Sequence, residues 1–135
     1  MGLTIPALLG AKLAQPDLPM VGLGADGSLL MRLGELETLA RTGVAAPLVI
    51  IDDRALGTMK SRQKTRGMPG YGLNLQPVDY ADVARACGLQ GVTVETPEAF
   101  QQALKKSMEA EETTLIDARV DAAAYQDSFA PMIGV

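Results

Sequence analysis

Short apolar runs alternate with segments of helical periodicity along most of this chain of 135 residues. The apolar runs that predict strands lie at residues 20–23, 48–51, 91–94 and 114–120. The segments that predict helices lie at residues 3–14, 29–42 and 79–86, with a further helix beginning at Pro97. Such alternation predicts an α/β fold with three layers, in which a parallel sheet carries helices on both faces.

The spacing of apolar residues predicts which face of each helix is buried. In the helix at 29–42 the apolar stripe consists of Leu29, Leu33, Leu36 and Ala40, and Gly43 ends the helix. In the helix that Thr96 caps and Pro97 begins, the stripe consists of Phe100, Ala103, Leu104 and Met108. Between residues 65 and 76 three glycines and a proline predict a mobile loop.

Composition limits the kinds of protein to consider. The length fits a single domain over residues 1–135, with a tail at 121–135, and no apolar run is long enough to span a membrane. A net charge of −4 argues against nucleic-acid or anionic-membrane partners. The single Cys87 excludes an internal disulfide and suits a cytoplasmic location. The absence of histidine removes the commonest general base.

The strongest chemical signal lies where two predicted strands end. The first strand leads into the glycine-rich segment 24–28, which contains Asp26, and a turn of this kind can direct backbone N–H groups at a phosphate. The second strand ends at Asp52 and Asp53. If the two strands are parallel neighbours, their acids emerge at the edge where open α/β sheets bind ligands. A magnesium ion that holds a diphosphate fits such a place.

These residues resemble the C-terminal domain of thiamine diphosphate-dependent enzymes, in the group of acetolactate synthase, pyruvate oxidase and benzoylformate decarboxylase. The family signature of Gly-Asp-Gly, a spacer and Asn-Asn is similar to residues 25–27 followed by residues 52–53. The segments at 1–14, 79–88 and 114–121 are also similar to the family, in order and in spacing. The resemblance implies that the chain carries a thiamine diphosphate-binding fold without the first strand and helix of the family's domain.

The resemblance implies a role for individual residues. Asp26 and Asp53 would bind magnesium through their side chains, and Ala55 would bind it through its backbone carbonyl. The residues that would contact the cofactor are Met1, Ala25, Gly27, Ser28, Leu56 and Gly57. Two positions depart from the family: Ala25 replaces a glycine where a positive φ would be useful, and Asp53 replaces an asparagine. The added charge of Asp53 faces an anionic diphosphate, so it is acceptable only with the metal bound.

The resemblance also implies a function and partners. A domain of this kind serves a 2-oxo acid decarboxylase or carboligase, which is a lyase or a transferase, and the substrate would be a small 2-oxo acid. The pyrimidine-binding domain, which supplies the glutamate that activates the cofactor, is missing from this chain. We therefore leave open whether the chain is an enzyme by itself. The expected partner is a second copy or a complementary chain with the pyrimidine-binding domain.

Other interpretations of the same residues remain. Asp26 could be a helix N-cap, and Asp52 and Asp53 could be solvated acids at a strand end. The basic run at 60–66 is typical of a solvated face, or it meets a carboxylate or phosphate of the substrate. Ser61 beside Lys60 could be a nucleophile, although no glycine elbow accompanies it. The alternative functions are therefore a self-associating fragment without turnover and a promiscuous hydrolase on the truncated scaffold.

Overall fold

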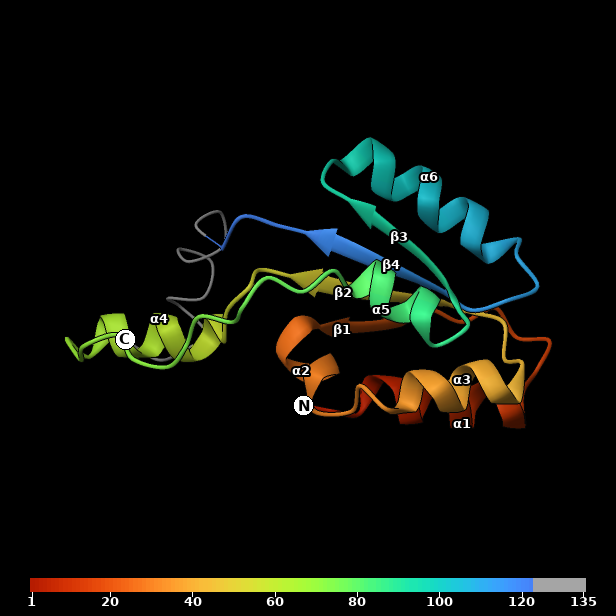
Figure 1. Ribbon diagram of the computed structural model, residues 1–135, viewed down its shortest axis with the longest axis horizontal. Coiled ribbons are helices and arrows are strands. Elements are labelled where there is room, and N and C mark those ends of the chain that lie inside the picture. Colours follow the sequence, from red (N-terminus) through yellow and green to blue (C-terminus); the bar gives the residue numbers. More distant parts are fainter. Residues whose placement is uncertain (123–135) are drawn as a thin grey trace.

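The computed structural model describes residues 1–122 and contains one parallel sheet of four strands (Figure 1). The strands are β1 (Gly22–Ala25), β2 (Pro47–Asp52), β3 (Gln90–Val94) and β4 (Thr114–Arg119). They lie in the order β1-β2-β4-β3, and all three neighbouring pairs are parallel. The expected α/β fold with a parallel sheet is confirmed. Most of the tail expected at 121–135 lies outside the described residues.

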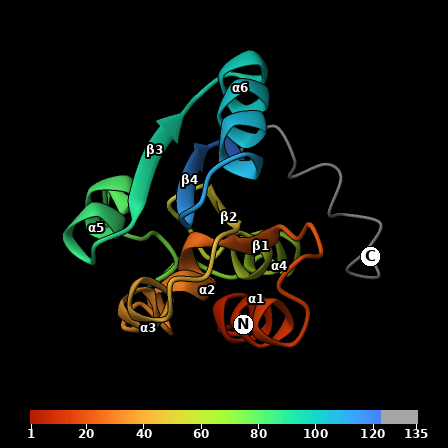
Figure 2. The ribbon, with the colours of Figure 1, turned by 90° about the vertical axis from the view of Figure 1, so that its right-hand side faces the viewer.

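Six helices surround the described sheet. They are α1 (Thr4–Ala14), α2 (Asp26–Leu30), α3 (Glu35–Thr42), α4 (Gly57–Thr65), α5 (Tyr80–Ala86) and α6 (Pro97–Met108). Helices α1, α3 and α5 lie on one side of the sheet and α6 on the other, as expected for three layers (Figure 2). None of the helices within residues 1–122 is both long and apolar enough to cross a membrane.

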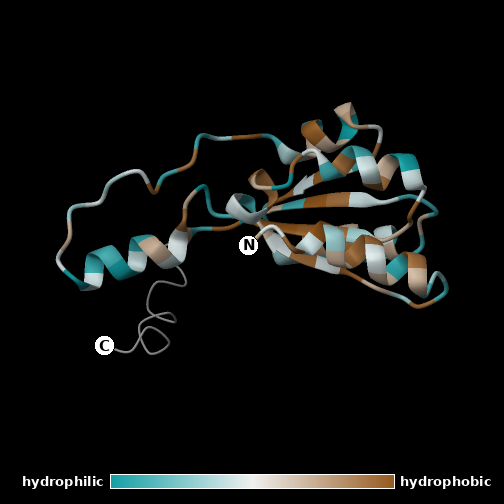
Figure 3. Cartoon of the chain, turned by 90° about the horizontal axis from the view of Figure 1, so that it is seen from below, coloured by the Kyte–Doolittle hydropathy of each residue, from teal (hydrophilic) through white to brown (hydrophobic). Residues whose placement is uncertain are grey.

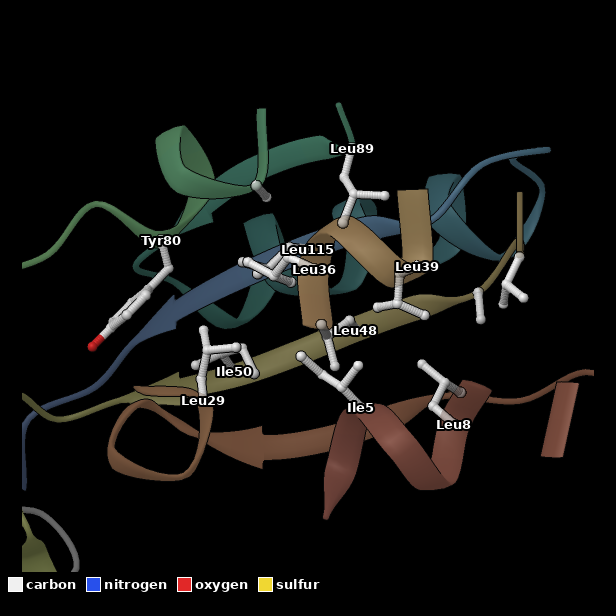
Figure 4. Packing of buried hydrophobic residues seen from close by; sticks show 13 residues of the cluster. Ile5, Leu8, Leu29, Leu36, Leu39, Leu48, Ile50, Tyr80, Leu89 and Leu115 are labelled. Carbon is white, nitrogen blue, oxygen red and sulfur yellow. The ribbon is translucent and has the colours of Figure 1, made fainter. Parts of the chain in front are cut away.

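The larger hydrophobic cluster lies between the sheet and the three helices on one face (Figure 4). Leu48 of β2 and Leu115 of β4 are fully buried there, as are Leu36 and Leu39 of α3. The alternation of side chains along a strand places every second residue of β2 and β4 on this face. The sequence pattern had predicted Leu36 for this core but had not included Leu39.

A smaller cluster lies under α6 on the opposite face. Phe100, Ala103 and Leu104 pack there against Val49 and the neighbouring apolar residues of the sheet, as their spacing predicts. Met108, which the pattern also placed in this stripe, is 42% exposed. That prediction was wrong, because α6 ends at Met108. The smaller cluster contains no residue of β1, and Leu23 is 67% exposed.

Local sequence explains where several helices begin and end. The Thr96 side chain accepts a hydrogen bond from Ala99 N (3.2 Å) at the start of α6. The Asp79 side chain accepts one from Asp82 N (2.8 Å) at the start of α5. Both are N-caps that satisfy backbone donors left free by the first helical turn. Gly43 ends α3 in the left-handed conformation, with φ of 65°.

Two predicted elements differ in the structure. The helix expected at 29–42 is divided into α2 and α3, with a turn at 31–34 that contains Gly34. The strand expected at 20–23 lies at 22–25 and therefore runs through two glycines. A Cβ at Gly22 would stand 2.8 Å from Cδ2 of Leu8, and one at Gly24 would stand 2.8 Å from Oγ1 of Thr4. The glycines therefore allow α1 to approach β1 closely.

Helix α4 was not predicted, because its sequence is polar and lacks an apolar stripe. The chain returns from it through residues 66–76, where a loop was expected, and this segment pairs with the chain before α4. Leu56 N donates to Leu73 O (2.8 Å), and Leu75 N donates to Arg54 O (2.8 Å). These bonds fix the position at which α4 leaves the sheet.

Candidate functional site

Strand register brings the acids of two strands together at the carboxyl edge of the sheet. Ala25, the last residue of β1, pairs with Ile51 of β2, so that Asp26 and Asp52 follow at the same level. Asp53 is the next residue along the chain. The expectation that these acids share one edge of a parallel sheet is therefore confirmed.

Asp26 is almost completely buried, with 1% of its surface exposed. Its Oδ1 accepts a hydrogen bond from Gly27 N (2.7 Å), whereas its Oδ2 has no hydrogen-bond partner. Burial, with the neighbouring carboxylates of Asp53 and Asp52, raises the pKa of Asp26 to about 6. An unpaired buried carboxylate oxygen is costly, so this atom is suited to binding a cation or a proton.

Asp53 is held in a tight turn after β2. Its Oδ1 accepts a hydrogen bond from Ala55 N (3.0 Å), and Asp52 Oδ1 accepts one from Arg54 N (3.0 Å). Arg54 lies between them with φ of 54°, the only non-glycine residue with a positive φ among those described. Burial and the charge of Asp52 raise the pKa of Asp53, although the Ala55 N–H and Lys60 act in the opposite direction. The turn thus fixes the direction of both carboxylates.

A cavity of about 390 Å³ opens beside these acids. Its lining residues are Ala25, Asp26, Ile51, Asp53, Ala55, Gly57 and Thr58. Five of the nine predicted site residues are in this set. Within residues 1–122 no group of three or more acidic or cysteine side chains is arranged to hold a metal ion.

The other four predicted site residues lie next to the cavity. A Cβ at Gly27 would stand 2.8 Å from Cδ2 of Leu56 and 3.6 Å from Cε of Met1, so these three residues meet. Met1 is 64% exposed. Ser28 Oγ accepts a hydrogen bond from Gly2 N (2.8 Å), which connects the start of the chain to α2.

Two sequence interpretations of this segment need correction. Residues 24–28 do not form a glycine-rich turn, because β1 continues to Ala25 and α2 begins at Asp26. Ala25 has φ of −123°, so the position requires no glycine. Ala25 is also the N-cap of α2, and Asp26 is its first helical residue. The alternative that Asp26 serves only as an N-cap is therefore wrong.

Three further buried groups were missed from the sequence. Asp52 and Asp117 are 2% and 0% exposed, and Tyr80 of α5 covers the same face of the sheet with its hydroxyl toward the strand ends (Figure 4). Burial and the charge of Asp52 raise the pKa of Asp117 to about 6. Burial and the three neighbouring carboxylates raise the pKa of Tyr80. An acid within the apolar strand 114–120 was the sequence signal for Asp117.

The suggested Ser61–Lys60 pair is not arranged for nucleophilic chemistry. Lys60 Nζ donates a hydrogen bond to Asn74 Oδ1 (2.9 Å). Ser61 is buried, with 8% of its surface exposed. A nucleophile needs access to a substrate, and the burial of Ser61 prevents that access.

The fold and this edge define a class of protein: an α/β domain whose carboxyl edge presents paired acids beside a cavity. Residues 1–118 match the family model described as "Thiamine pyrophosphate enzyme, C-terminal TPP binding domain". The chain therefore belongs to the family of C-terminal thiamine pyrophosphate-binding domains of thiamine pyrophosphate enzymes.

Similar proteins agree with this family. A sulfoacetaldehyde acetyltransferase of Rhodobacter capsulatus is 35% identical over 127 residues, covering 89% of this chain and 21% of that protein. An acetolactate synthase large subunit of Parasynechococcus marenigrum is 32% identical over 124 residues, covering 89% and 20%. A solved thiamine diphosphate-dependent 4-hydroxybenzoylformate decarboxylase of Rhodococcus jostii superposes with a TM-score of 0.84 at 30% identity, covering 90% and 23%. The chain spans about a fifth of the length of these relatives.

Proposed function

We propose that this chain binds magnesium and thiamine diphosphate at the carboxyl edge of its sheet. Asp26 and Asp53 bind the metal through their side chains, and Ala55 binds it through its backbone carbonyl. The diphosphate and water supply the remaining oxygen ligands. Magnesium prefers oxygen ligands and commonly binds one or two carboxylates together with phosphates, which fits this set.

The observation that carries the proposal is the unpaired Oδ2 of Asp26. This atom belongs to a side chain that is 1% exposed and lines the cavity that Asp53 and Ala55 also line. Two carboxylates so close repel one another, and a divalent cation between them removes that repulsion. The same cation also accounts for Asp53 in the place of the family's asparagine, because it balances the added negative charge.

The chain's other residues hold and orient the cofactor. In this proposal backbone groups at Gly27 and Ser28, at the start of α2, bind diphosphate oxygens, and the Gly27 N–H is shared with Asp26 Oδ1. Ala25 and Gly57 line the cavity, whereas Met1 and Leu56 provide an apolar contact beside Gly27. When bound, thiamine diphosphate supplies the stabilisation of negative charge on the carbonyl carbon of a 2-oxo acid after decarboxylation.

The wider activity that we propose is that of a 2-oxo acid decarboxylase or carboligase of the acetolactate synthase type. Support comes from relatives that are named as an acetolactate synthase, an acetyltransferase and a decarboxylase. Because the chain spans about a fifth of their length, we assign it the metal and diphosphate part of the reaction. In this proposal a complementary chain that carries a pyrimidine-binding domain completes the site.

Calorimetry and thermal unfolding with magnesium and thiamine diphosphate test the proposal. We expect both ligands together to raise the melting temperature of the chain, because a ligand that binds only the folded state stabilises it. Asp26→Asn and Asp53→Ala should each abolish most of this rise. Asp117→Asn is the matched control, since Asp117 is equally buried but does not line the cavity. An undiminished rise in Asp26→Asn would show that the metal assignment is wrong.

A further inference from the structure

A second cavity, which we call the amino-edge cavity, lies where the strands begin, at the edge opposite to the paired acids. Gln90 of β3 and Thr114 of β4 line it, and these two residues are paired at the start of their strands. In Figure 1 the arrow of β4 points away from this edge and toward α4, a largely hydrophilic helix that projects from the other end of the body (Figure 3). The volume of the cavity is about 490 Å³, which is within the range of small-molecule sites.

The walls of the amino-edge cavity combine apolar side chains with buried hydroxyl groups. Val92 of β3 and Ala103 of α6 line it, and both pack in the smaller hydrophobic cluster. Ser107, one helical turn after Ala103, is 3% exposed and donates its hydroxyl to Ala103 O (2.7 Å). Its oxygen can still accept a hydrogen bond from a ligand. Apolar walls with a few fixed polar groups are typical of a site that binds a small organic molecule.

Two opposite charges border the amino-edge cavity without pairing with each other. Lys106 of α6 and Glu111 of the loop that follows both line the cavity and are exposed. Neither side chain forms an ion pair within residues 1–122. The neighbouring Glu112 is held in place by Gln90, whose Nε2 donates to its Oε2 (2.9 Å). A ligand that carries both a carboxylate and an ammonium group can satisfy Lys106 and Glu111 together.

The strand beside the cavity is suited to binding a peptide main chain. Strand β3 is the outermost strand of the described sheet, so one side of its backbone has no neighbouring strand. Its first three residues, Gln90, Gly91 and Val92, line the cavity. An open strand edge of this kind can bind the amide groups of an extended peptide. Gly91 O already accepts a hydrogen bond from Arg85 Nη1 (2.5 Å), which leaves the other free backbone groups of this edge for a ligand.

We propose that the amino-edge cavity binds a short peptide in its zwitterionic form, of about the length of a dipeptide. The peptide carboxylate binds Lys106, its ammonium group binds Glu111, and the amide between them lies against β3. Small side chains of the peptide pack on Val92 and Ala103. The site is separate from the one proposed for magnesium and thiamine diphosphate, and peptide binding requires neither of those ligands.

Nuclear magnetic resonance titration of the full chain with dialanine tests the proposal. We expect a dissociation constant on the order of a millimolar or lower, with shifts of the Gly91, Val92 and Ala103 amide signals. N-acetyl-dialanine lacks the ammonium group and dialanine amide lacks the carboxylate. Each should bind about tenfold more weakly or worse, because each leaves one charge of the site without its partner. Free alanine should also bind more weakly, since it lacks the peptide amide.

Substitutions locate the site. Lys106→Gln and Glu111→Gln should each raise the dissociation constant of dialanine about tenfold. Lys105→Gln and Glu109→Gln are the matched controls, because these neighbours are exposed and do not line the cavity. Thermal unfolding confirms that each variant is folded.

Asp26→Asn should leave dialanine binding unchanged, so that failure of the metal site and failure of the peptide site are distinguishable. The proposal is overturned if dialanine does not bind at about ten times the expected dissociation constant. Equal affinity for the blocked peptides or for alanine, or an affinity unchanged in both Lys106→Gln and Glu111→Gln, also overturns it.

Discussion

Side-chain alternation along three parallel strands places Asp26, Asp52 and Asp117 next to one another on one face of the sheet. Each follows or belongs to a strand whose neighbouring residues are apolar, and Tyr80 covers the group from α5. Because water is excluded there, an ionised carboxylate is disfavoured unless a cation or a proton accompanies it. We therefore expect these buried carboxylates to make the stability of the domain depend on pH and on a bound cation.

For Asp117 this leads to a prediction about pH. Its pKa in the folded chain is about 6, above the ordinary value of 3.8. Between these values the folded chain keeps a proton that the unfolded chain has released, so the free energy of unfolding falls as pH rises through this window. We expect Asp117→Asn to raise the melting temperature above about pH 7 and to flatten its decrease with pH. Arg119 keeps its contacts with Asp79 and Glu95 in this variant.

Thermal unfolding from acidic to neutral pH checks this prediction. Asp17→Asn is the control, because Asp17 is exposed and its substitution should leave the profile of the wild type unchanged. A lower melting temperature for Asp117→Asn at every pH would contradict the expected sign.

At the scale of elements, close packing of a helix on a strand depends on individual glycines. These glycines do not recur at a regular spacing, so the hydrophobic pattern does not reveal them. The absence of a side chain at Gly22 and Gly24 allows α1 to pack closely on β1, and the absence of one at Gly91 allows α5 to pack closely on β3. The sequence indicated that each helix would cover the sheet, but not how closely it would pack. These contacts determine the position of Tyr80 above the buried acids, and therefore the shape of the site.

Gly91→Ala should be strongly destabilising. A Cβ at this position would overlap the backbone carbonyl of Ala81, and backbone cannot yield as a flexible side chain can. We expect a loss of roughly 1–3 kcal/mol or more in the free energy of unfolding, measured by urea denaturation. Gly10→Ala is the matched control, because nothing lies within 4 Å of its Cβ. This change within α1 should stabilise the chain by roughly 0.5–1 kcal/mol. Equal urea midpoints for the two variants would refute the argument.

At the scale of the whole molecule, the paired acids and a cavity lie together at the carboxyl edge of the sheet. Asp26 and Asp53 line one cavity together with Ala25, Ile51 and Ala55, and Met1 and Leu56 meet beside it at Gly27. In the proposed site the paired acids bind the metal and the metal binds the diphosphate, so we expect these parts of the ligand to supply most of the binding free energy.

We therefore expect magnesium diphosphate and magnesium thiamine diphosphate to bind this chain with dissociation constants within about tenfold of one another. Calorimetric titration of the two ligands measures the ratio, and Asp26→Asn should weaken both. We also expect residues 1–135 by themselves to show no turnover of pyruvate, because the family resemblance assigns activation of the cofactor to a glutamate of another domain, and such proton-transfer assistance is worth about 10²–10⁴-fold. Release of carbon dioxide by the chain alone, lost in Asp26→Asn, would overturn this expectation.

The amino-acid sequence by itself determined the order of the four strands and of most helices along the chain, the parallel sheet, and the edge at which Asp26 and Asp53 meet. These properties follow from local periodicity and from the direction of parallel strands. Only the tertiary structure decided that Asp52 and Asp117 are buried, that α4 stands away from the body and that Met108 is exposed. Whether a residue is buried depends on which elements cover it. Strand register and helix packing determine this cover, and both depend on contacts between residues that are distant in the sequence.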